Sequence, residues 1–167
     1  MESRHETVSE PRFAVDEMLG KLARRLRMMG LDVEHRRPFP DEALLDIAKK
    51  EARIIITRDR KLAAAGPPPD VWLVEEDLPF DQLVEVVKRL ELDLTNKAFT
   101  RCSLCNKLLV DVPKSKVAGK VPPFIFSTQS EYRRCPKCNK IYWPGTHRKH
   151  MEKIFDEVAK SVAALTK

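Results

Sequence analysis

Between residues 12 and 96, short apolar runs alternate with amphipathic stretches, and this pattern predicts an α/β domain. Apolar runs rich in β-forming residues predict strands, and apolar residues spaced three and four apart predict helices. Strands are expected at 13–15, 31–35, 53–57 and 71–74. Helices are expected at 18–29, from Asp41 past Ala48, from the turn at 58–60 through Leu62 to Ala65, and at about 80–90. Strands that alternate in this way with helices predict a parallel sheet with helices on both faces.

Two local signals delimit the expected helices. Gly30 is placed to end the first helix, because glycine readily adopts the left-handed conformation found after a helix. Asp41 follows Pro40 and is expected to cap the second helix by accepting a backbone N–H.

The chain divides into four segments. Residues 1–11 are expected to be a disordered leader, 12–96 the α/β domain, 97–146 a cysteine-containing ribbon and 147–167 a final helix. One face of that helix is apolar: Met151, Ile154, Phe155, Val158, Val162 and Leu165. Such a face needs a partner surface. The sequence leaves open whether the partner is the α/β domain or the ribbon.

The formal net charge of +6 is unevenly distributed along the chain. Residues 12–96 carry 15 lysines and arginines against 17 acidic residues, whereas residues 97–167 carry 15 against 5. A compact unit with such a basic excess attracts polyanions through phosphate contacts and counterion release, so nucleic acid is the expected partner. The alternative is a charged surface that only confers solubility.

The chain lacks a run of about 20 apolar residues, which a membrane span requires, and its first residues lack the apolar core of a signal peptide. We therefore expect a cytoplasmic protein that does not interact with membranes. Thiols stay reduced in that compartment, which favours metal binding over disulfides.

The cysteines form two close pairs, Cys102 with Cys105 and Cys135 with Cys138. Each Cys-x-x-Cys pair has the spacing of a zinc knuckle, and two knuckles complete a tetrahedral site. Four sulfurs leave no position for water or substrate, so this zinc ion is expected to be structural. The insert between the pairs contains prolines and Gly119, and a hairpin excursion is one way to accommodate it.

Three alternatives to this zinc site remain open. A redox Cys-x-x-Cys normally occurs once, at the start of a helix, whereas here there are two pairs. An iron–sulfur cluster uses the same ligand type. His147 and His150 follow closely, and three roles are open to them: they replace a cysteine ligand, they bind a second ion, or they lie in the first turn of the last helix and contact solvent or phosphate.

Carboxylates recur where the expected strands end. Asp16, Asp59 and Asp77 each follow a predicted strand, and the helix that Asp41 is expected to cap can begin at the same edge. Ligands of open parallel sheets gather at the carboxyl ends of the strands. Clustered carboxylates require a cation, and their oxygen ligands favour Mg²⁺ or Mn²⁺, which can activate water for phosphodiester hydrolysis.

Each acid also has a purely structural explanation. Asp41 can serve only as a helix cap, and Asp77 can be a solvated member of an acidic run. Nearby basic residues can hold phosphates or form surface salt bridges. These residues are Lys21, Arg24, Arg25 and Arg27 on or near the polar face of the first helix, and Arg58 beside Asp59.

Three stretches resemble the Mut-seven C-terminal ribonuclease family, a PIN-like domain with a fused zinc ribbon. They are FAVDEMLGKLARRLRMMGLDV, RIIITRDRKL, and the pair RCSLCNKLL and YRRCPKCNKIYWPGTH, and together they span roughly residues 12–150. The resemblance implies a PIN-like fold, acidic metal-dependent catalysis and RNA as substrate. Asp16 stands at the first-strand acid, and Asp59 at the acid of the Thr-Arg-Asp motif of PIN domains. For the middle acid, Asp41 is the first choice, with Asp46 or Glu42 in reserve.

Three functional hypotheses follow, and the one ranked last, a zinc-ribbon protein that binds another protein, makes little use of the uneven charge. The first is a Mg²⁺- or Mn²⁺-dependent ribonuclease whose basic zinc ribbon binds RNA, possible substrates being ribosomal and transfer RNA. The second is a catalytically inactive protein of the same fold that binds RNA or ribosomes. The candidate RNA-binding residues are Lys21, Arg25, Arg58, Lys107, Arg133, Arg134 and Lys137.

Overall fold

A four-stranded parallel sheet lies at the centre of the α/β domain. The computed structural model describes residues 10–66, 69–91 and 95–166, so most of the expected leader lies outside the described residues. The strands are β1 (Phe13–Val15), β2 (Val33–Glu34), β3 (Ile54–Thr57) and β4 (Val71–Leu73), in the order β2-β1-β3-β4. After β1 the chain forms β2 on one side of β1, and it later forms β3 on the other side of β1. The carboxyl ends of β1 and β3 therefore flank a topological switch point.

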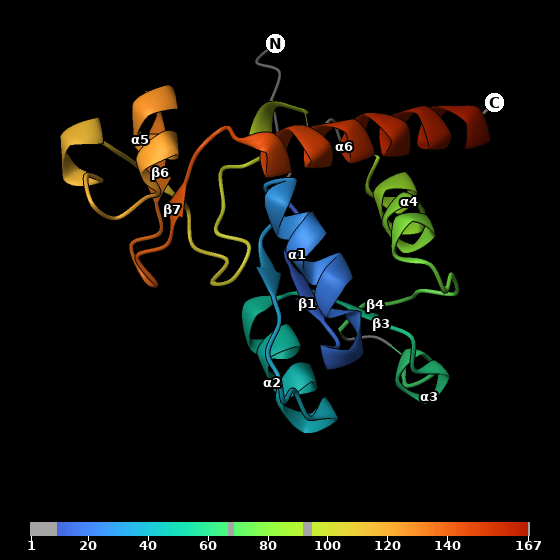
Figure 1. The fold of residues 1–167 in the computed structure, drawn as a ribbon. Helices are drawn as coiled ribbons and strands as arrows, with labels where there is room; N and C mark the ends of the chain where they lie inside the picture. Colours follow the sequence, from blue (N-terminus) through green and yellow to red (C-terminus); the bar gives the residue numbers. More distant parts are fainter. Residues whose placement is uncertain (1–9, 67–68, 92–94, 167) are drawn as a thin grey trace, which may run out of the picture.

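Helices cover both faces of this sheet, as the sequence predicts (Figure 1). One face packs against α1 (Gly20–Met28) and α4 (Pro79–Leu90), and the other against α2 (Asp41–Glu51) and the short α3 (Arg60–Ala63). Strand β1 shows why both faces of the sheet need a covering layer. Successive side chains of a strand point to opposite faces, and those of β1 are apolar on both. Phe13 and Val15 enter the core beneath α1 and α4, whereas Ala14 enters the core beneath α2 and α3.

Several expected element boundaries change, and α3, for example, ends at Ala63 and not at Ala65. A short 3-10 helix, η1 (Glu17–Leu19), precedes α1, and β2 is shorter than the expected 31–35 strand. Gly30 does follow α1 with a positive φ of 94°, and a Cβ there would lie 2.3 Å from the Lys97 carbonyl oxygen. The capping role predicted for Asp41 is wrong: Pro40 is the N-cap, and Asp41 is the first helical residue.

The ribbon contains a second, antiparallel sheet. Its strands are β5 (Val110–Val112), β6 (Tyr132–Arg134) and β7 (Ile141–Tyr142), in the order β5-β6-β7. Short helices η2 (Thr95–Lys97), η3 (Lys114–Lys116) and α5 (Pro123–Thr128) complete it, so the insert between the cysteine pairs contains helices rather than a simple hairpin. Only a small apolar cluster, centred on Val117, Val121 and Tyr132, supports this sheet.

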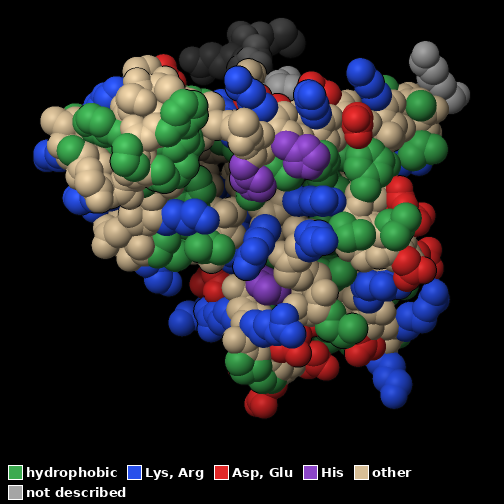
Figure 2. Space-filling view, viewed as in Figure 1, with side chains coloured by type: hydrophobic (Ala, Val, Ile, Leu, Met, Phe, Trp, Pro, Cys, Tyr) green, Lys and Arg blue, Asp and Glu red, His purple; other side chains and the backbone are tan. Residues whose placement is uncertain are grey.

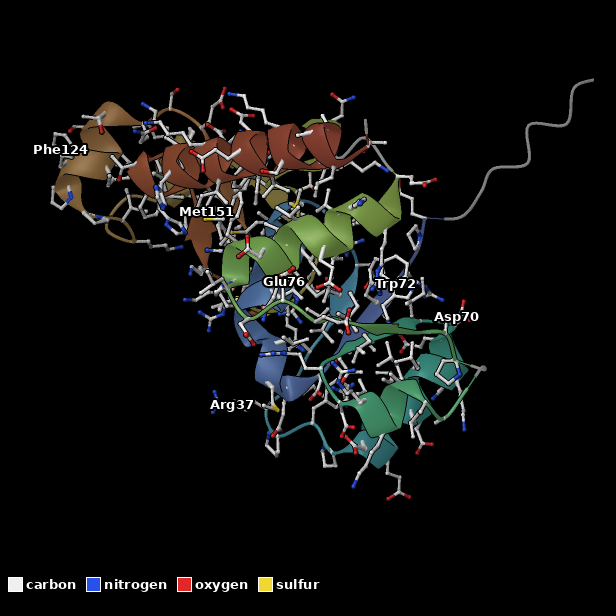
Figure 3. The ribbon with its side chains drawn as sticks, turned by 90° about the vertical axis from the view of Figure 1, so that its right-hand side faces the viewer. Arg37, Asp70, Trp72, Glu76, Phe124 and Met151 are labelled. Atoms are coloured by element: carbon white, nitrogen blue, oxygen red, sulfur yellow. The ribbon has the colours of Figure 1, made fainter. Side chains whose placement is uncertain are left out.

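The last helix, α6 (Thr146–Leu165), packs against the α/β domain rather than lying free. Val158 is fully buried in the same core as α1 and α4, with Ile154 and Phe155 packed around it. Figures 1 and 3 show α6 running from the ribbon across α4, with Met151 on its inward side. None of the described helices is both long and apolar enough to cross a membrane.

Arg27 joins the ribbon to the α/β domain. The residue is 4% exposed, and its guanidinium donates hydrogen bonds to the carbonyl oxygens of Val33 (2.8 Å), Leu104 (2.9 Å) and Ser103 (3.2 Å). Asn106 adds a second link, since its side chain accepts a hydrogen bond from the Val33 N–H and donates one to Asp32. Arg27 therefore has a structural role and does not belong to the polar face of α1.

Replacing Arg27 with methionine should lower the free energy of unfolding by about 2–4 kcal/mol, because it leaves buried carbonyl oxygens without a charged donor. Urea unfolding of the zinc-loaded protein measures this change. Arg24→Met is the matched control, since Arg24 is an exposed residue of the same helix and should change stability by less than about 0.5 kcal/mol. Equal stability of the two variants would contradict the linking role of Arg27.

Candidate functional site

The carboxyl edge of the parallel sheet holds a buried carboxylate, Asp16. Asp16 directly follows β1, and its side chain is 8% exposed. The hydroxyl of Thr57, the last residue of the adjacent β3, donates a 2.7 Å hydrogen bond to Asp16 Oδ2. This bond spans the two strands at the topological switch point, so the fold itself sets the position of the carboxylate.

Asp59 is connected to Asp16 through the same hydroxyl. Its backbone N–H donates to Thr57 Oγ1 at 3.0 Å. Its carboxylate Oδ1 caps α3 by accepting the N–H groups of Lys61 (2.7 Å) and Leu62 (3.2 Å). One carboxylate oxygen is thus used to fix the turn, while the side chain as a whole stays exposed. Asp16, Thr57 and Asp59 form one hydrogen-bonded unit.

The other two candidate acids lie in different surroundings. Asp77 is 83% exposed and forms an ion pair with Arg58. Asp41 is exposed in the first turn of α2, and the reserve candidates Asp46 and Glu42 are exposed on the same helix. Within the part of the chain that the structure describes, no three carboxylates come close enough to share one ion. Of the four candidate acids, the structure therefore connects two, Asp16 and Asp59, through hydrogen bonds to Thr57.

Two further residues lie beside this edge: Glu17, which the sequence offers as a reserve candidate acid, and His35, which the sequence reasoning missed. His35 Nε2 lies 3.2 Å from the Glu17 carbonyl oxygen, and Glu17 Oε2 accepts the Phe39 N–H at 2.7 Å. Burial lowers the pKa of His35, and the nearby positive charges of Arg27 and Arg24 lower it further, against the opposing effects of the hydrogen bond to the Glu17 carbonyl and of Asp16. The surroundings of His35 therefore favour its neutral form. The sequence signal that could have identified His35 is its position at the end of the expected strand 31–35, at the edge where ligands of such sheets bind.

Basic side chains border the acids. Figure 2 shows lysine, arginine and histidine side chains gathered over α1 and the first turns of α6, with acidic side chains mostly beyond this band. Arg25 has a buried Nη1 atom without a hydrogen-bond partner within the described chain, and burial lowers the pKa of its guanidinium. Lys21 and Arg58 are exposed. These donors remain available to an anionic ligand, although Arg58 already pairs with Asp77.

The four cysteines converge in the ribbon. Their sulfur atoms all lie within 4.8 Å of one another, and Cys102 Sγ is 3.7 Å from Cys138 Sγ. Sulfurs bound tetrahedrally at a Zn–S distance of about 2.3 Å lie about 3.8 Å apart. The set therefore fits a zinc ion. His147 and His150 are in the first turns of α6 and do not belong to the cluster.

The two knuckles repeat the same local structure, which explains the convergence. In each, the N–H of the first cysteine donates to the carbonyl of the lysine five residues later, Lys107 or Lys140. In each, the asparagine after the second cysteine has a positive φ, 64° at Asn106 and 60° at Asn139. Asparagine tolerates this conformation better than most residues. Both turns thus aim their sulfurs at one point.

Tyr142 adds a polar contact behind the metal ligands. Its hydroxyl lies 3.1 Å from Cys102 Sγ. Burial alone would raise the pKa of Cys102, but hydrogen bonds from Tyr142 and from the N–H groups of Cys105 and Leu104 outweigh it and lower that pKa to about 7. Burial, together with the neighbouring thiols, raises the pKa of Cys105 to about 12. A bound cation is what allows all four groups to be thiolates together.

Comparison with known proteins gives one result that covers most of the chain. The model of a family described as Mut7-C RNAse domain matches residues 11–155, which include both the acidic edge and the ribbon. No curated protein and no solved structure matches the chain significantly.

Proposed function

Because the chain belongs to the Mut7-C RNAse domain family, we propose that it is a metal-dependent ribonuclease that hydrolyses phosphodiester bonds of RNA. The observation that supports this proposal most directly is the buried Asp16 carboxylate, joined through Thr57 to Asp59 at the switch point of the sheet. This is where open α/β sheets bind their ligands. A carboxylate at 8% exposure has no hydrophobic role there and requires a polar partner.

Asp16 and Asp59 would hold the catalytic Mg²⁺ or Mn²⁺, and Asp41 or Asp77 would complete the site when RNA binds. Two carboxylates suffice for initial binding, because Mg²⁺ usually keeps several waters and takes its remaining ligands from substrate phosphates. When bound, such an ion supplies an activated water and offsets the charge that develops on the phosphate. Thr57 fixes one oxygen of Asp16 through its hydroxyl, and the amides of Lys61 and Leu62 fix one oxygen of Asp59.

The basic residues would position the RNA. On the α/β domain these are Lys21, Arg25 and Arg58, which can contact phosphates near the acids. On the ribbon, Lys107 and Lys137 are exposed beside the knuckles, while Arg133 is partly held by Asp111 and Arg134 by Asn139. The structural zinc ion would keep these ribbon residues in place without taking part in hydrolysis, because its four sulfur ligands leave no open position.

We further propose a cytoplasmic location and ribosomal or transfer RNA as the substrate. A cytoplasmic location agrees with four unpaired thiols, since reduced thiols persist in that compartment.

A second candidate function is RNA or ribosome binding without cleavage. It is favoured by one observation, namely that the described residues bring no three carboxylates together. A site with too few fixed acids retains affinity for RNA through its basic residues but holds a catalytic cation weakly.

Incubation with RNA tests the two functions against each other. The purified zinc-loaded protein should cut structured or single-stranded RNA when Mn²⁺ or Mg²⁺ is added, and not in its absence. A double variant, Asp16→Asn with Asp59→Asn, should be inactive while still binding RNA. Salt-sensitive RNA binding with no cleavage under either metal would favour the second function. Undiminished cleavage by the double variant would reveal a contaminating nuclease.

A further inference from the structure

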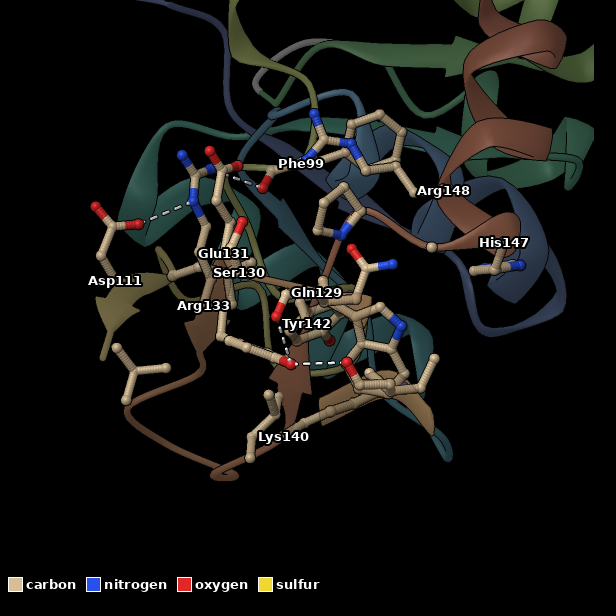
Figure 4. Close-up of a pocket in the computed structure, with 18 of the residues that line it drawn as sticks. Phe99, Asp111, Gln129, Ser130, Glu131, Arg133, Lys140, Tyr142, His147 and Arg148 are labelled. Atoms are coloured by element: carbon tan, nitrogen blue, oxygen red, sulfur yellow. Dashed lines mark hydrogen bonds and ion pairs between the residues drawn. The ribbon is translucent and has the colours of Figure 1, made fainter. Parts of the chain in front are cut away.

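A groove separates the ribbon sheet from the first turn of α6. It has a volume of about 860 Å³, which lies in the upper part of the range of about 300–1,000 Å³ typical of ligand sites. Figure 4 shows Phe99 and Arg148 at one end and Lys140 and Tyr142 at the other. Figure 2 shows the hollow from outside. None of the four candidate catalytic acids lines it.

Aromatic side chains are concentrated in this groove. Five of the eleven aromatic residues of the chain line it: Phe99, Phe124, Tyr132, Tyr142 and Trp143. Phe124 is 73% exposed, an unusual exposure for a large apolar side chain with no packing role, and Figure 3 shows it at the tip of the ribbon. Trp143 is only partly buried against the ribbon core. Tyr132 is buried in the ribbon core, so the rings open to a planar ligand are the more exposed ones, such as Phe124 and Trp143.

Positive charge surrounds the rings. Five lysines and arginines line the groove against two acidic residues, Asp111 and Glu131. Arg133 is held by Asp111, and Arg148 by Glu152. Lys114 and Lys140 instead lie over the rings of Phe126 and Tyr142, at 4.9 and 5.4 Å, and neither is within 4.0 Å of a carboxylate of the described residues. Their ammonium groups are therefore available to phosphates.

The first turn of α6 adds backbone donors at the same place. Gly145 is its N-cap and offers no side chain to the free N–H groups, and the turn lines the groove. Free N–H groups and the helix dipole at such an end favour anions. The groove thus combines phosphate-binding groups at its rim with aromatic rings inside.

We propose that this groove binds a single-stranded segment of RNA, with an unpaired base stacked on its aromatic rings and the adjoining phosphates on Lys114 and Lys140. Base faces are accessible to side chains only where the RNA is unpaired, which excludes a duplex as the occupant. The inference rests on the proposed function for the choice of RNA as the polymer. It deepens that function by specifying unpaired RNA as the form that is recognised.

The fluorescence of Trp143, which lines the groove, can report RNA binding there directly. The chain has two tryptophans, and the other, Trp72, lies in β4 of the α/β domain. In a Trp72→Phe background, a short single-stranded RNA should quench Trp143 fluorescence in a saturable manner, without added Mg²⁺ or Mn²⁺. The same sequence as a duplex should bind at least about tenfold more weakly, because stacking contributes about 1–3 kcal/mol per base.

Matched substitutions locate the binding. Phe124→Ala should weaken binding at least about fivefold, whereas Leu108→Ala, which removes another exposed apolar side chain of the ribbon outside the groove, should not. Lys114→Gln with Lys140→Gln should weaken binding more than Lys116→Gln with Lys120→Gln, which removes equal charge from outside the groove. A melting curve for each variant identifies any loss of folding.

Three results would overturn the proposal: equal quenching by duplex, equal effects of groove and control variants, or RNA binding without any change in Trp143 fluorescence. Cleavage that depends on Asp16 but is accompanied by any of these would refute the groove and leave the ribonuclease function intact. Groove binding without cleavage under either metal would refute catalysis and leave the groove intact.

Discussion

Asp16→Asn is expected to lower the rate of RNA cleavage at least about 100-fold, comparable to the loss of one charge-stabilising group in other active sites. The amide matches the carboxylate in shape, and its oxygen can still accept the Thr57 hydroxyl at the end of β1. What it loses is the negative charge that binds a hard cation, for which a neutral amide is a poor substitute. The effect should therefore appear in activity, while the melting temperature changes little.

Asp70→Asn is the matched control for this experiment. It removes the same charge, but Asp70 immediately precedes β4, and Figure 3 shows it at the opposite end of the sheet from Glu76. Initial rates of cleavage across a Mn²⁺ titration compare the two variants. If both lose activity equally, the effect comes from overall charge, and the acidic edge is not the catalytic site.

Removal of the zinc ion is expected to unfold the ribbon and leave the parallel sheet folded. Structural zinc contributes about 10–16 kcal/mol in small domains, whereas the apolar core of the ribbon is centred on only three buried residues. After chelation, amide hydrogen exchange should accelerate in β5, β6 and β7. Exchange in β1 and β3 should remain slow, because the core of the α/β domain does not include the cysteines.

A pair of adjacent substitutions tests the same point without a chelator. Cys138→Ser removes one metal ligand, and Lys137→Ser introduces the same residue one position earlier, also at an exposed site. Only the first should reduce the zinc content below the expected one ion per chain and destabilise the ribbon. Fully protected ribbon amides in Cys138→Ser would show that the knuckles fold without metal.

Features determined by neighbouring residues were predictable from the sequence. Each helix and strand of the α/β domain carries its own apolar pattern, and the Gly30 turn and the two knuckles depend on residues close together in the chain. The family match agrees with the resemblance read from these motifs. Local patterns of this kind suffice to predict the elements, the parallel arrangement of the strands and the cysteines that converge on a candidate metal site.

Features that depend on loop length and docking were not predictable. Asp16 directly follows its strand, but Asp77 lies several residues past Leu73 and extends into solvent. Proximity to a strand end in sequence did not distinguish these two acids. Arg27 looked like its basic neighbours on α1, because only the docked ribbon buries it. The partner of α6 also required three-dimensional information, since its apolar face has no preference between two surfaces.

The position of α6 has a consequence for how the protein is made. Val158, in α6, belongs to the same core as Phe13, in β1, so this core stays incomplete until Val158 has left the ribosome. The ribbon lies between α4 and α6 in the sequence and is synthesised before that core can close. In topological terms it is an insertion within the α/β domain, not an appendage. Nascent chains that end before α6 would expose apolar surface and depend on chaperones.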